Sequence, residues 1–158
     1  MVVEFEGKIG GNSEDLFNMI EPERCFIMLC THYTERECLG RNLFGDRDQR
    51  LQYLEAIRPG DIGILLNISK NELIGIFKSQ SEAQLDIQED AWDGEFRAQV
   101  TVQPLGELKR ISEAASVLAE AGIKLNVLPS GAMVPLLPVQ EGDCVKKLLK
   151  NFREVSSD

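Results

Sequence analysis

The chain has 158 residues, 43% hydrophobic and 27% charged, with a formal net charge of -9 at pH 7. This size and composition predict one ordinary globular domain whose core needs neither disulfides nor a metal. The acidic balance argues against indiscriminate binding of polyanions, which depends on Lys and Arg neutralising phosphates. No run approaches the roughly 18 to 20 apolar residues that span a membrane, and the charged first ten residues do not resemble a secretory segment. We therefore expect a cytoplasmic protein with no membrane partner.

The cysteines are an even set of four: Cys25, Cys30, Cys38 and Cys144. A cytosolic chain of this size seldom keeps disulfides, so we predict that all four thiols are reduced. Their spacing also lacks the paired knuckles of a zinc site, even when His32, the single histidine, is included. We predict no metal site.

No catalytic motif is visible in the chain. A nucleophile elbow, a phosphate-cradling glycine loop and an HExxH helix are all missing. The acidic residues between positions 89 and 95 are more typical of a solvated loop than of a catalytic pair. We expect a binding module without catalytic residues or a cofactor.

The first elements in chain order are a short helix and a buried strand. Residues 1–23 predict an acidic extension, in which a capped helix carries Leu16, Phe17 and Ile20 on one face. A single domain then covers residues 24–155. It begins with the apolar run Cys25–Cys30, which predicts a central strand buried on both faces.

Two short helices are predicted next. Thr34 and Glu37 form a capping-box pattern, and the pair Asp46 and Gln49 repeats it. The first helix carries Cys38 inward, and the second ends before Pro59. The inward positions of this second helix have helical spacing: Leu51, Leu54 and Ile57.

A buried hairpin over residues 61–78 is the strongest prediction. Its two apolar runs, IGILLNI and ELIGIF, are too short for helices and are joined by polar turn residues. Arg58–Asp61 should form a sharp corner before the first strand, since Pro59 fixes φ and Gly60 tolerates positive values.

The remaining elements are a strand, a helix, a rim segment and a closing helix. The strand should run over residues 96–102 and be closed by Pro104 and Gly106, and the helix should begin near Ile111 and end at Gly122. Three prolines place residues 125–139 at the rim of the sheet. The closing helix has the apolar stripe Val145, Leu148, Leu149 and Phe152.

Several motifs in a fixed order resemble the development and cell death (DCD) domain. They are CFIMLC, TERECLGRNLFG, IRPGD, ELIGIF and LDIQEDAWDGEFRAQV, and they cover roughly residues 24–103. The departures are small: Asp86 stands where Asn is usual, Arg97 where Pro is common, and Asp46 replaces a Pro. The resemblance implies an α+β fold, a PUA-like mixed β-barrel with surrounding helices. It also implies a protein-interaction or stress-signalling module, in which the hairpin edge or the LFG region meets a protein partner.

The same order is similar, more distantly, to YTH and EVE domains. In YTH domains the corresponding segments surround a pocket for one methylated adenine. That resemblance implies RNA or a modified nucleobase as the ligand and places Thr31, His32, Tyr33, Asn67 and Trp92 around the pocket. Trp92 is the only tryptophan, so a cage of several tryptophans cannot form, and Phe44, His32 or Tyr33 would have to serve as further stacking surfaces.

Two questions stay open from the sequence. Trp92 is either a wall of a ligand pocket or a lid that packs over the end of the barrel. The six arginines between residues 24 and 58 either form a solvated surface with acidic partners or gather beside a ligand. For the base-binding alternative, Arg41 and Arg97 are the predicted contacts to flanking phosphates.

Overall fold

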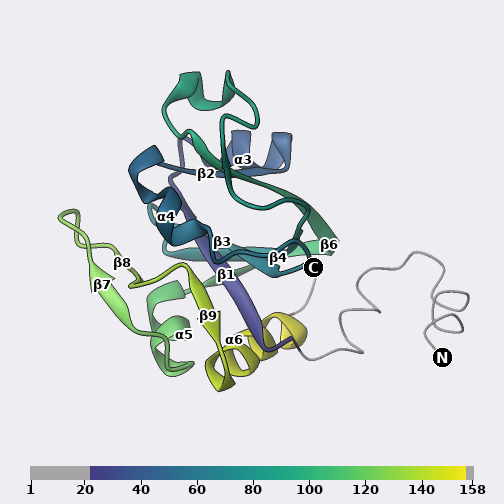
Figure 1. Cartoon of the computed structure of the whole chain (residues 1–158). Helices are drawn as coiled ribbons and strands as arrows, with labels where there is room; N and C mark the ends of the chain where they lie inside the picture. The colour runs from purple at the N-terminus through teal and green to yellow at the C-terminus, as the bar shows by residue number, and fades with distance from the viewer. Residues whose placement is uncertain (1–21, 156–158) are drawn as a thin grey trace, which may run out of the picture.

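The computed structural model describes residues 22–155, and a curled seven-stranded sheet forms their centre (Figure 1). The strand order is β2 (Leu43–Asp46), β6 (Ala98–Ser112), β4 (Glu72–Ser79), β3 (Ile62–Asn67), β1 (Arg24–Cys30) and β9 (Val139–Glu141), and β5 (Gln84–Leu85) pairs with β6. With its four helices this is the mixed α+β fold predicted. The short helix predicted near the start lies outside the described residues, and the boundary at residue 24 stays a prediction.

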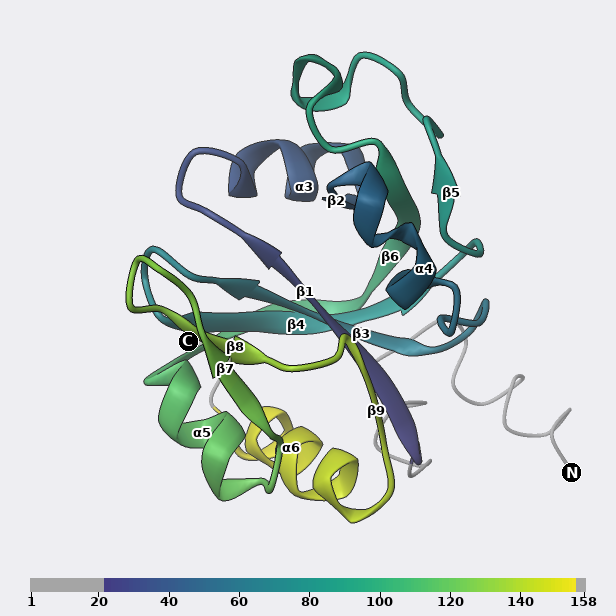
Figure 2. The same cartoon turned by 60° about the vertical axis from the view of Figure 1, so that its left-hand side comes forward.

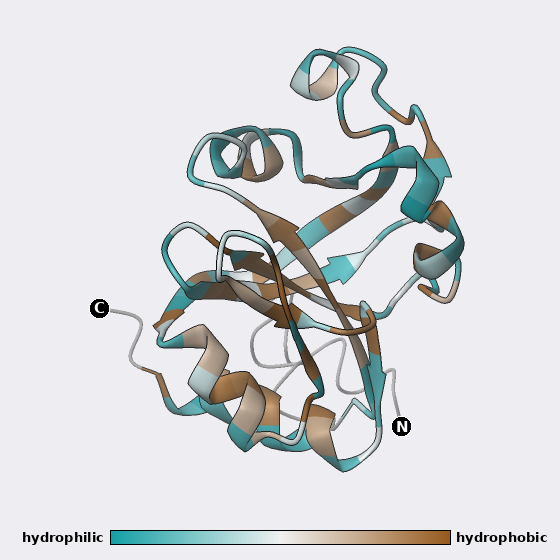
Figure 3. Cartoon of the chain, turned by 90° about the vertical axis from the view of Figure 1, so that its left-hand side faces the viewer, coloured by the Kyte–Doolittle hydropathy of each residue, from teal (hydrophilic) through white to brown (hydrophobic). Residues whose placement is uncertain are grey.

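Two hydrophobic cores lie on opposite faces of the sheet. Cys25 and Ile27 of β1 belong to one core, and Phe26, Met28 and Cys30 belong to the other. Helices α5 (Ala114–Glu120) and α6 (Asp143–Glu154) cover the first face, and α3 (Glu35–Arg41) and α4 (Leu51–Leu54) cover the second (Figure 2). The prediction that β1 is buried on both faces is therefore confirmed. In Figure 3 the central strands are coloured mostly as hydrophobic, whereas the helices mix hydrophobic and hydrophilic residues.

The predicted hairpin is also confirmed. β3 and β4 pair antiparallel, with Asn67 opposite Glu72, and every residue of β3 is buried. The corner before β3 closes as expected: Asp61 N–H donates to the Arg58 carbonyl at 3.0 Å, and Gly60 has φ +95°. The Asp61 carboxylate also pairs with Arg24 at 3.0 Å, which ties this corner to the start of β1.

The two capping boxes do not form, although helices begin near both places. Thr34 is the N-cap residue of α3, but its hydroxyl accepts the N–H of Thr31 at 2.9 Å instead of capping the helix. Asp46 lies at the end of β2, and its carboxylate accepts from Arg47 N–H and Arg50 Nε. The second helix also ends earlier than expected, at Leu54.

β6 is longer than the sequence indicates. Pro104 and Gly106 do not end it, because the pairing with β4 resumes beyond a bulge: Phe77 lies opposite Pro104, and Gly75 lies opposite Lys109. Ile111 consequently belongs to this strand, opposite Leu73, and not to the helix that follows. The irregular stretch begins directly after Pro104, which has no N–H for the ladder.

The last part of the chain covers the first core and forms one rim. The four predicted inward residues of α6 are all buried: Val145, Leu148, Leu149 and Phe152. β7 (Leu125–Val127) and β8 (Met133–Pro135) form a separate two-stranded hairpin, and β9 adds to the edge of the main sheet beside β1. Within residues 22–155, no helix is long and apolar enough to cross a membrane.

Candidate ligand-binding site

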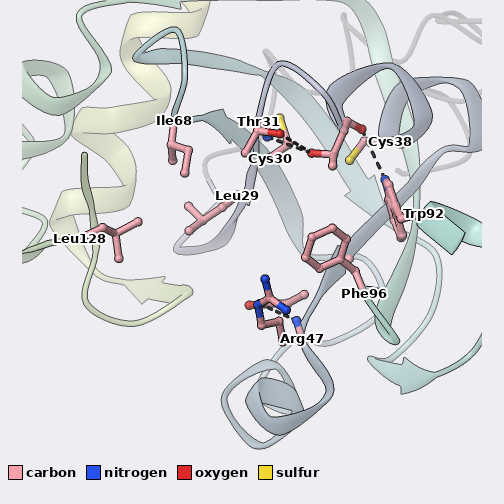
Figure 4. Close-up of a pocket in the computed structure, with 12 residues that line it drawn as sticks. Leu29, Cys30, Thr31, Cys38, Arg47, Ile68, Trp92, Phe96 and Leu128 are labelled. Carbon is pink, nitrogen blue, oxygen red and sulfur yellow. Dashed lines mark hydrogen bonds between the residues drawn. The ribbon is translucent and has the colours of Figure 1, made fainter. Parts of the chain in front are cut away.

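A cavity lies where the curled sheet fails to close. β1 and β2 contact each other across the second core, but no ladder joins them. The pairing of β1 with β9 stops at Phe26, and the last bond on that side runs from Ile27 N–H to the Pro138 carbonyl. The end of β1 therefore has an open side, and a cavity of about 300 Å³ occupies it (Figure 4).

Two aromatic rings form one wall of the cavity. The rings of Trp92 and Phe96 lie at 79° to each other with centroids 5.8 Å apart. The Trp92 indole N–H points to the Thr34 carbonyl at 3.4 Å, and the side chain keeps only 7% of its surface exposed. Trp92 is thus both a packed lid and a cavity wall.

Gly45 allows this packing. A Cβ at Gly45 would lie 2.5 Å from Cζ3 of Trp92 and 3.1 Å from Cβ of Phe96. Real Cβ atoms do not approach so closely, so the indole ring can lie against β2 only because this position has no side chain. The glycine of the LFG motif therefore has a direct structural role at the cavity.

The loop that carries Trp92 has a strained backbone held from α3. Trp92 and Asp93 have φ of 48° and 54°, a left-handed conformation that is uncommon for bulky side chains. The Trp92 N–H donates to the Glu37 carboxylate at 2.7 Å. Arg41 binds Glu37 at 2.9 Å and also contacts Gln88 and Asp90 of the same loop. These bonds hold the indole in place, as strained residues at ligand sites require.

Arg47 places a positive charge at the mouth of the cavity. Its guanidinium carbon lies 5.5 Å from the centre of the Phe96 ring, within the range of a cation–π contact. Its ion pair with Glu95 spans 3.5 Å, and both side chains are 56% exposed. Such an exposed pair is weak, so Arg47 can exchange it for an anionic ligand.

The inner part of the cavity is neutral. Cys30, Cys38 and the threonines Thr31 and Thr34 line it. A hydrogen bond that the Cys30 thiol donates to Cys38, together with burial, raises the pKa of Cys30, so this thiol stays protonated at neutral pH. A ligand in the cavity would contact aromatic and aliphatic side chains and a few neutral polar groups. Such a lining suits a planar ring with small substituents.

Of the eight predicted site residues, the structure places two at the cavity: Thr31 and Trp92. His32 and Tyr33 stack on each other with ring centroids 3.8 Å apart, and Tyr33 is 83% exposed. Phe44 is fully buried in the second core between Phe26 and Phe77, so it cannot stack on a ligand without repacking.

The other three predicted residues make hydrogen bonds and ion pairs within the fold. Asn67 is buried and accepts the N–H groups of Ser69 and Lys70, which shapes the hairpin turn. Arg41 is bound to its acidic loop partners, and Arg97 pairs with Asp86 at 2.7 Å. Neither of these two arginines lines the cavity, and their contacts to flanking phosphates stay a prediction.

The sequence reasoning missed Arg47, Phe96, Gly45 and Cys38. Phe96 belongs to the quoted segment LDIQEDAWDGEFRAQV, and Gly45 belongs to LFG, so the motifs contained the signal for both. Arg47 could not be distinguished from the other arginines by sequence alone. Five of the six lie between residues 35 and 58, where acidic residues are interspersed with them. Only the fold shows which of them faces the open side of β1.

Comparison with known families supplies the classification. The model of the development and cell death domain matches residues 24–124. The chain belongs to this family. The match includes every strand from β1 to β6 and the helix α5, and it ends before the β7–β8 hairpin. No curated protein matches the chain by sequence.

Solved structures of YTH domains share the fold of this DCD domain. One is the YTH domain of Zygosaccharomyces rouxii MRB1 in complex with N6-methyladenosine RNA, with a TM-score of 0.55, 14% identity, and coverage of 87% of this chain and 93% of that one. Another is the Mmi1 YTH domain in complex with RNA, with a TM-score of 0.58, 12% identity, and coverage of 84% and 79%. The Pho92 YTH domain with m6A has a TM-score of 0.55 and 13% identity, with coverage of 86% and 87%. At these identities the likeness shows the fold alone.

The residues of this DCD domain do not suggest a metal site. Within the described range, residues 22–155, no group of three or more His, Cys, Asp or Glu side chains lies close enough to hold a metal ion. All four cysteines are free thiols.

Proposed function

We propose that this DCD domain is a non-enzymatic binding module that takes one modified or flipped base of single-stranded nucleic acid into the cavity beside Trp92. The observation that carries the proposal is the cavity itself, open at the end of β1 and walled by Trp92 and Phe96. Had this region been packed solid, the base-binding alternative would have had no site.

The size and chemistry of the cavity support a single base. A volume of about 300 Å³ lies at the lower end of the range for small-molecule pockets. Aromatic faces stack on any base, whatever its sequence. The neutral thiol and hydroxyl groups around the ring would tolerate an added methyl group better than a charge.

The fold comparison also supports the binding of a modified base. Two of the YTH structures named above contain N6-methyladenosine or RNA that carries it. A shared fold does not establish a function, so it is the coincidence of this fold with an aromatic-walled cavity that supports the proposal.

The protein-interaction alternative loses the two surfaces predicted for it. Leu43 and Phe44 of the LFG motif are fully buried. Both edges of the β3–β4 hairpin are paired, β3 with β1 and β4 with β6. Leu43, Phe44 and the two hairpin edges thus offer a partner little free surface, and this supports the cavity as the site of binding.

A thermal-shift screen of free modified and unmodified nucleosides tests the proposal. A ligand at a hundred times its dissociation constant should stabilise the domain by about 2.7 kcal/mol. Leu29→Phe adds volume at a residue that lines the cavity and should reduce the shift, whereas Leu137→Phe, at a 53% exposed position away from the cavity, should not. The proposal fails if no nucleoside shifts the transition, or if both variants respond like the parent chain.

A further inference from the structure

The cavity beside Trp92 does not end at Arg47. A second cavity of about 200 Å³ continues along the open side of β1. The two cavities share four lining residues: Leu29, Asp46, Arg47 and Leu128. They therefore form two arms of one groove, with the half-exposed guanidinium of Arg47 at the junction.

The segment that follows the family match supplies six of the 13 residues that line the second arm. Its outer wall is formed by Asn126, Leu128, Pro135 and Leu136 of the β7–β8 hairpin and its flanks, whereas the family model ends at residue 124. The opposite wall comes from β1 and from Arg50 and Leu54. The lining is mainly apolar, and Asn126 adds a carboxamide that can both donate and accept hydrogen bonds.

We propose that the second arm binds the nucleotide next to the base held beside Trp92, with the linking phosphate at Arg47. The inference rests on the proposed function and deepens it, because it adds a second nucleotide and the linking phosphate to the one base held beside Trp92. It also assigns the selection of the neighbouring nucleotide to residues 126–136, outside the part matched by the family model.

The charges at the junction support a phosphate there. Arg50 is already bound to Asp46 at 2.8 Å, an i,i+4 pair that neutralises both groups. Arg47 has a longer, exposed ion pair with Glu95 and lies over the Phe96 ring. A guanidinium binds two phosphate oxygens at once, so a phosphate at the junction competes well with that contact.

The apolar second arm suits a base or ribose better than a further phosphate. Leu128 and Leu136 offer aliphatic surface, and Leu136 is 55% exposed although it is a large apolar residue. Single-stranded recognition commonly combines such contact with hydrogen bonds to base edges, which the amide of Asn126 can provide.

Calorimetric titration of the full chain with three probes tests the inference: N6-methyladenosine, and two dinucleotides that carry the modified base in the first or second position. At least one dinucleotide should bind about fivefold or more tighter than the nucleoside, which corresponds to about 1 kcal/mol from the phosphate contact and the apolar surface buried in the second arm. Arg47→Gln should reduce the dinucleotide affinity by a larger factor than the nucleoside affinity, because only the dinucleotide carries the linking phosphate. Its control is Arg97→Gln, because Arg97 is also about half exposed but lies away from both cavities.

The hairpin contact has a closely matched pair of variants. Leu136→Asp should remove the dinucleotide advantage, whereas Leu137→Asp should keep it, since both side chains are similarly exposed and only Leu136 lines the groove. The inference is overturned if the nucleoside binds and neither dinucleotide binds more tightly, or if the two leucine variants behave alike. If no probe binds at all, the proposed function itself falls, and the inference falls with it.

Discussion

The backbone N–H of Trp92 donates to the Glu37 carboxylate at 2.7 Å, across a separation of 55 residues. This bond joins the strained loop to helix α3, and Arg41 supports it by pairing with Glu37 and with Asp90. Glu37 was expected to cap its own helix. It instead fixes the position of the only tryptophan, and we regard it as a positioning residue for the cavity wall.

Replacing Glu37 with Ala should loosen the Trp92 loop. The loss leaves a partly buried N–H without its acceptor, which costs about 1–3 kcal/mol, and it releases Arg41 from one of its partners. We expect a lower free energy of unfolding in urea and a red-shifted emission from Trp92. Glu55→Ala, at an exposed position at the end of α4, is the control. Equal effects of the two variants would contradict this role for Glu37.

Gly45→Ala should displace the indole ring. The new methyl group would overlap Trp92, whose Cζ3 lies 2.5 Å from the ideal Cβ position. Overpacking of this kind costs about 1–3 kcal/mol, and the shifted ring should narrow the cavity and weaken ligand binding.

Gly40→Ala provides the comparison for Gly45→Ala. Gly40 lies within α3, and a Cβ there meets nothing within 4 Å. Alanine should therefore stabilise the helix by about 0.5–1 kcal/mol relative to glycine. Chemical denaturation of both variants measures the difference, and a Gly45→Ala protein as stable as Gly40→Ala would show that the ring does not depend on this close approach.

Patterns local in the chain predicted the elements well. The shortness of the two apolar runs in residues 61–78 and the polar turn between them predicted the hairpin, and the spacing of Val145, Leu148, Leu149 and Phe152 predicted α6. Prolines and glycines were less dependable as signals for the end of a strand. Pro104 reads as the end of a strand, yet β4 continues the ladder beyond a bulge, because tertiary pairing outweighs the local preference of a single residue.

The candidate site was harder to predict because its residues are brought together by the fold. Trp92 and Thr31 could be chosen from their motifs, and both line the cavity. Phe44 and Gly45 are neighbours in LFG, but successive residues of β2 face opposite sides. The Phe44 ring therefore points into the core, whereas the backbone of Gly45 lies against the Trp92 ring. The separation of Arg47 from Arg41 and Arg97 depends on which carboxylates each one meets, and sequence spacing does not record that.

The ion pair between Glu35 and Arg110 predicts a pH dependence of stability. The hydrogen bonds from Arg110 hold the pKa of the Glu35 carboxyl below its ordinary value of 4.5, and Asn67 adds a bond to the same group. A carboxyl whose pKa is lowered by folding contributes stability above its unfolded value, and that contribution is lost as the pH falls through the folded pKa. Acidification below 4.5 should therefore remove it.

Arg110→Gln should lose this contribution at neutral pH. The difference in the free energy of unfolding between the parent chain and the variant should shrink as the pH falls below the ordinary pKa of Glu35. Urea denaturation at neutral pH and at several acidic values measures it, with the exposed Arg58→Gln as the control. A difference that stays constant or grows on acidification would contradict the assignment.

The thiols should differ sharply in reactivity. Cys25, Cys30 and Cys38 are buried, and burial raises the pKa of Cys25 to about 12. Only the thiolate reacts quickly, so the native protein should be labelled at the partly exposed Cys144, and the denatured protein without reductant should show four thiols. Mass spectrometry after alkylation counts both. Two or fewer thiols in the denatured protein would disprove the prediction of four free cysteines.

The central claim is that a base enters the cavity beside Trp92, and the emission of this single tryptophan reports it most directly. A short single-stranded RNA that carries one N6-methyladenosine should change the emission saturably at low salt. It should bind about fourfold or more tighter than the unmodified RNA, because a buried methyl group is worth about 0.8 kcal/mol. Binding should weaken only mildly with salt, since few phosphates meet cations on a chain of net charge -9. No change in emission at saturation, or equal affinity for the two RNAs with a steep dependence on salt, would contradict the account.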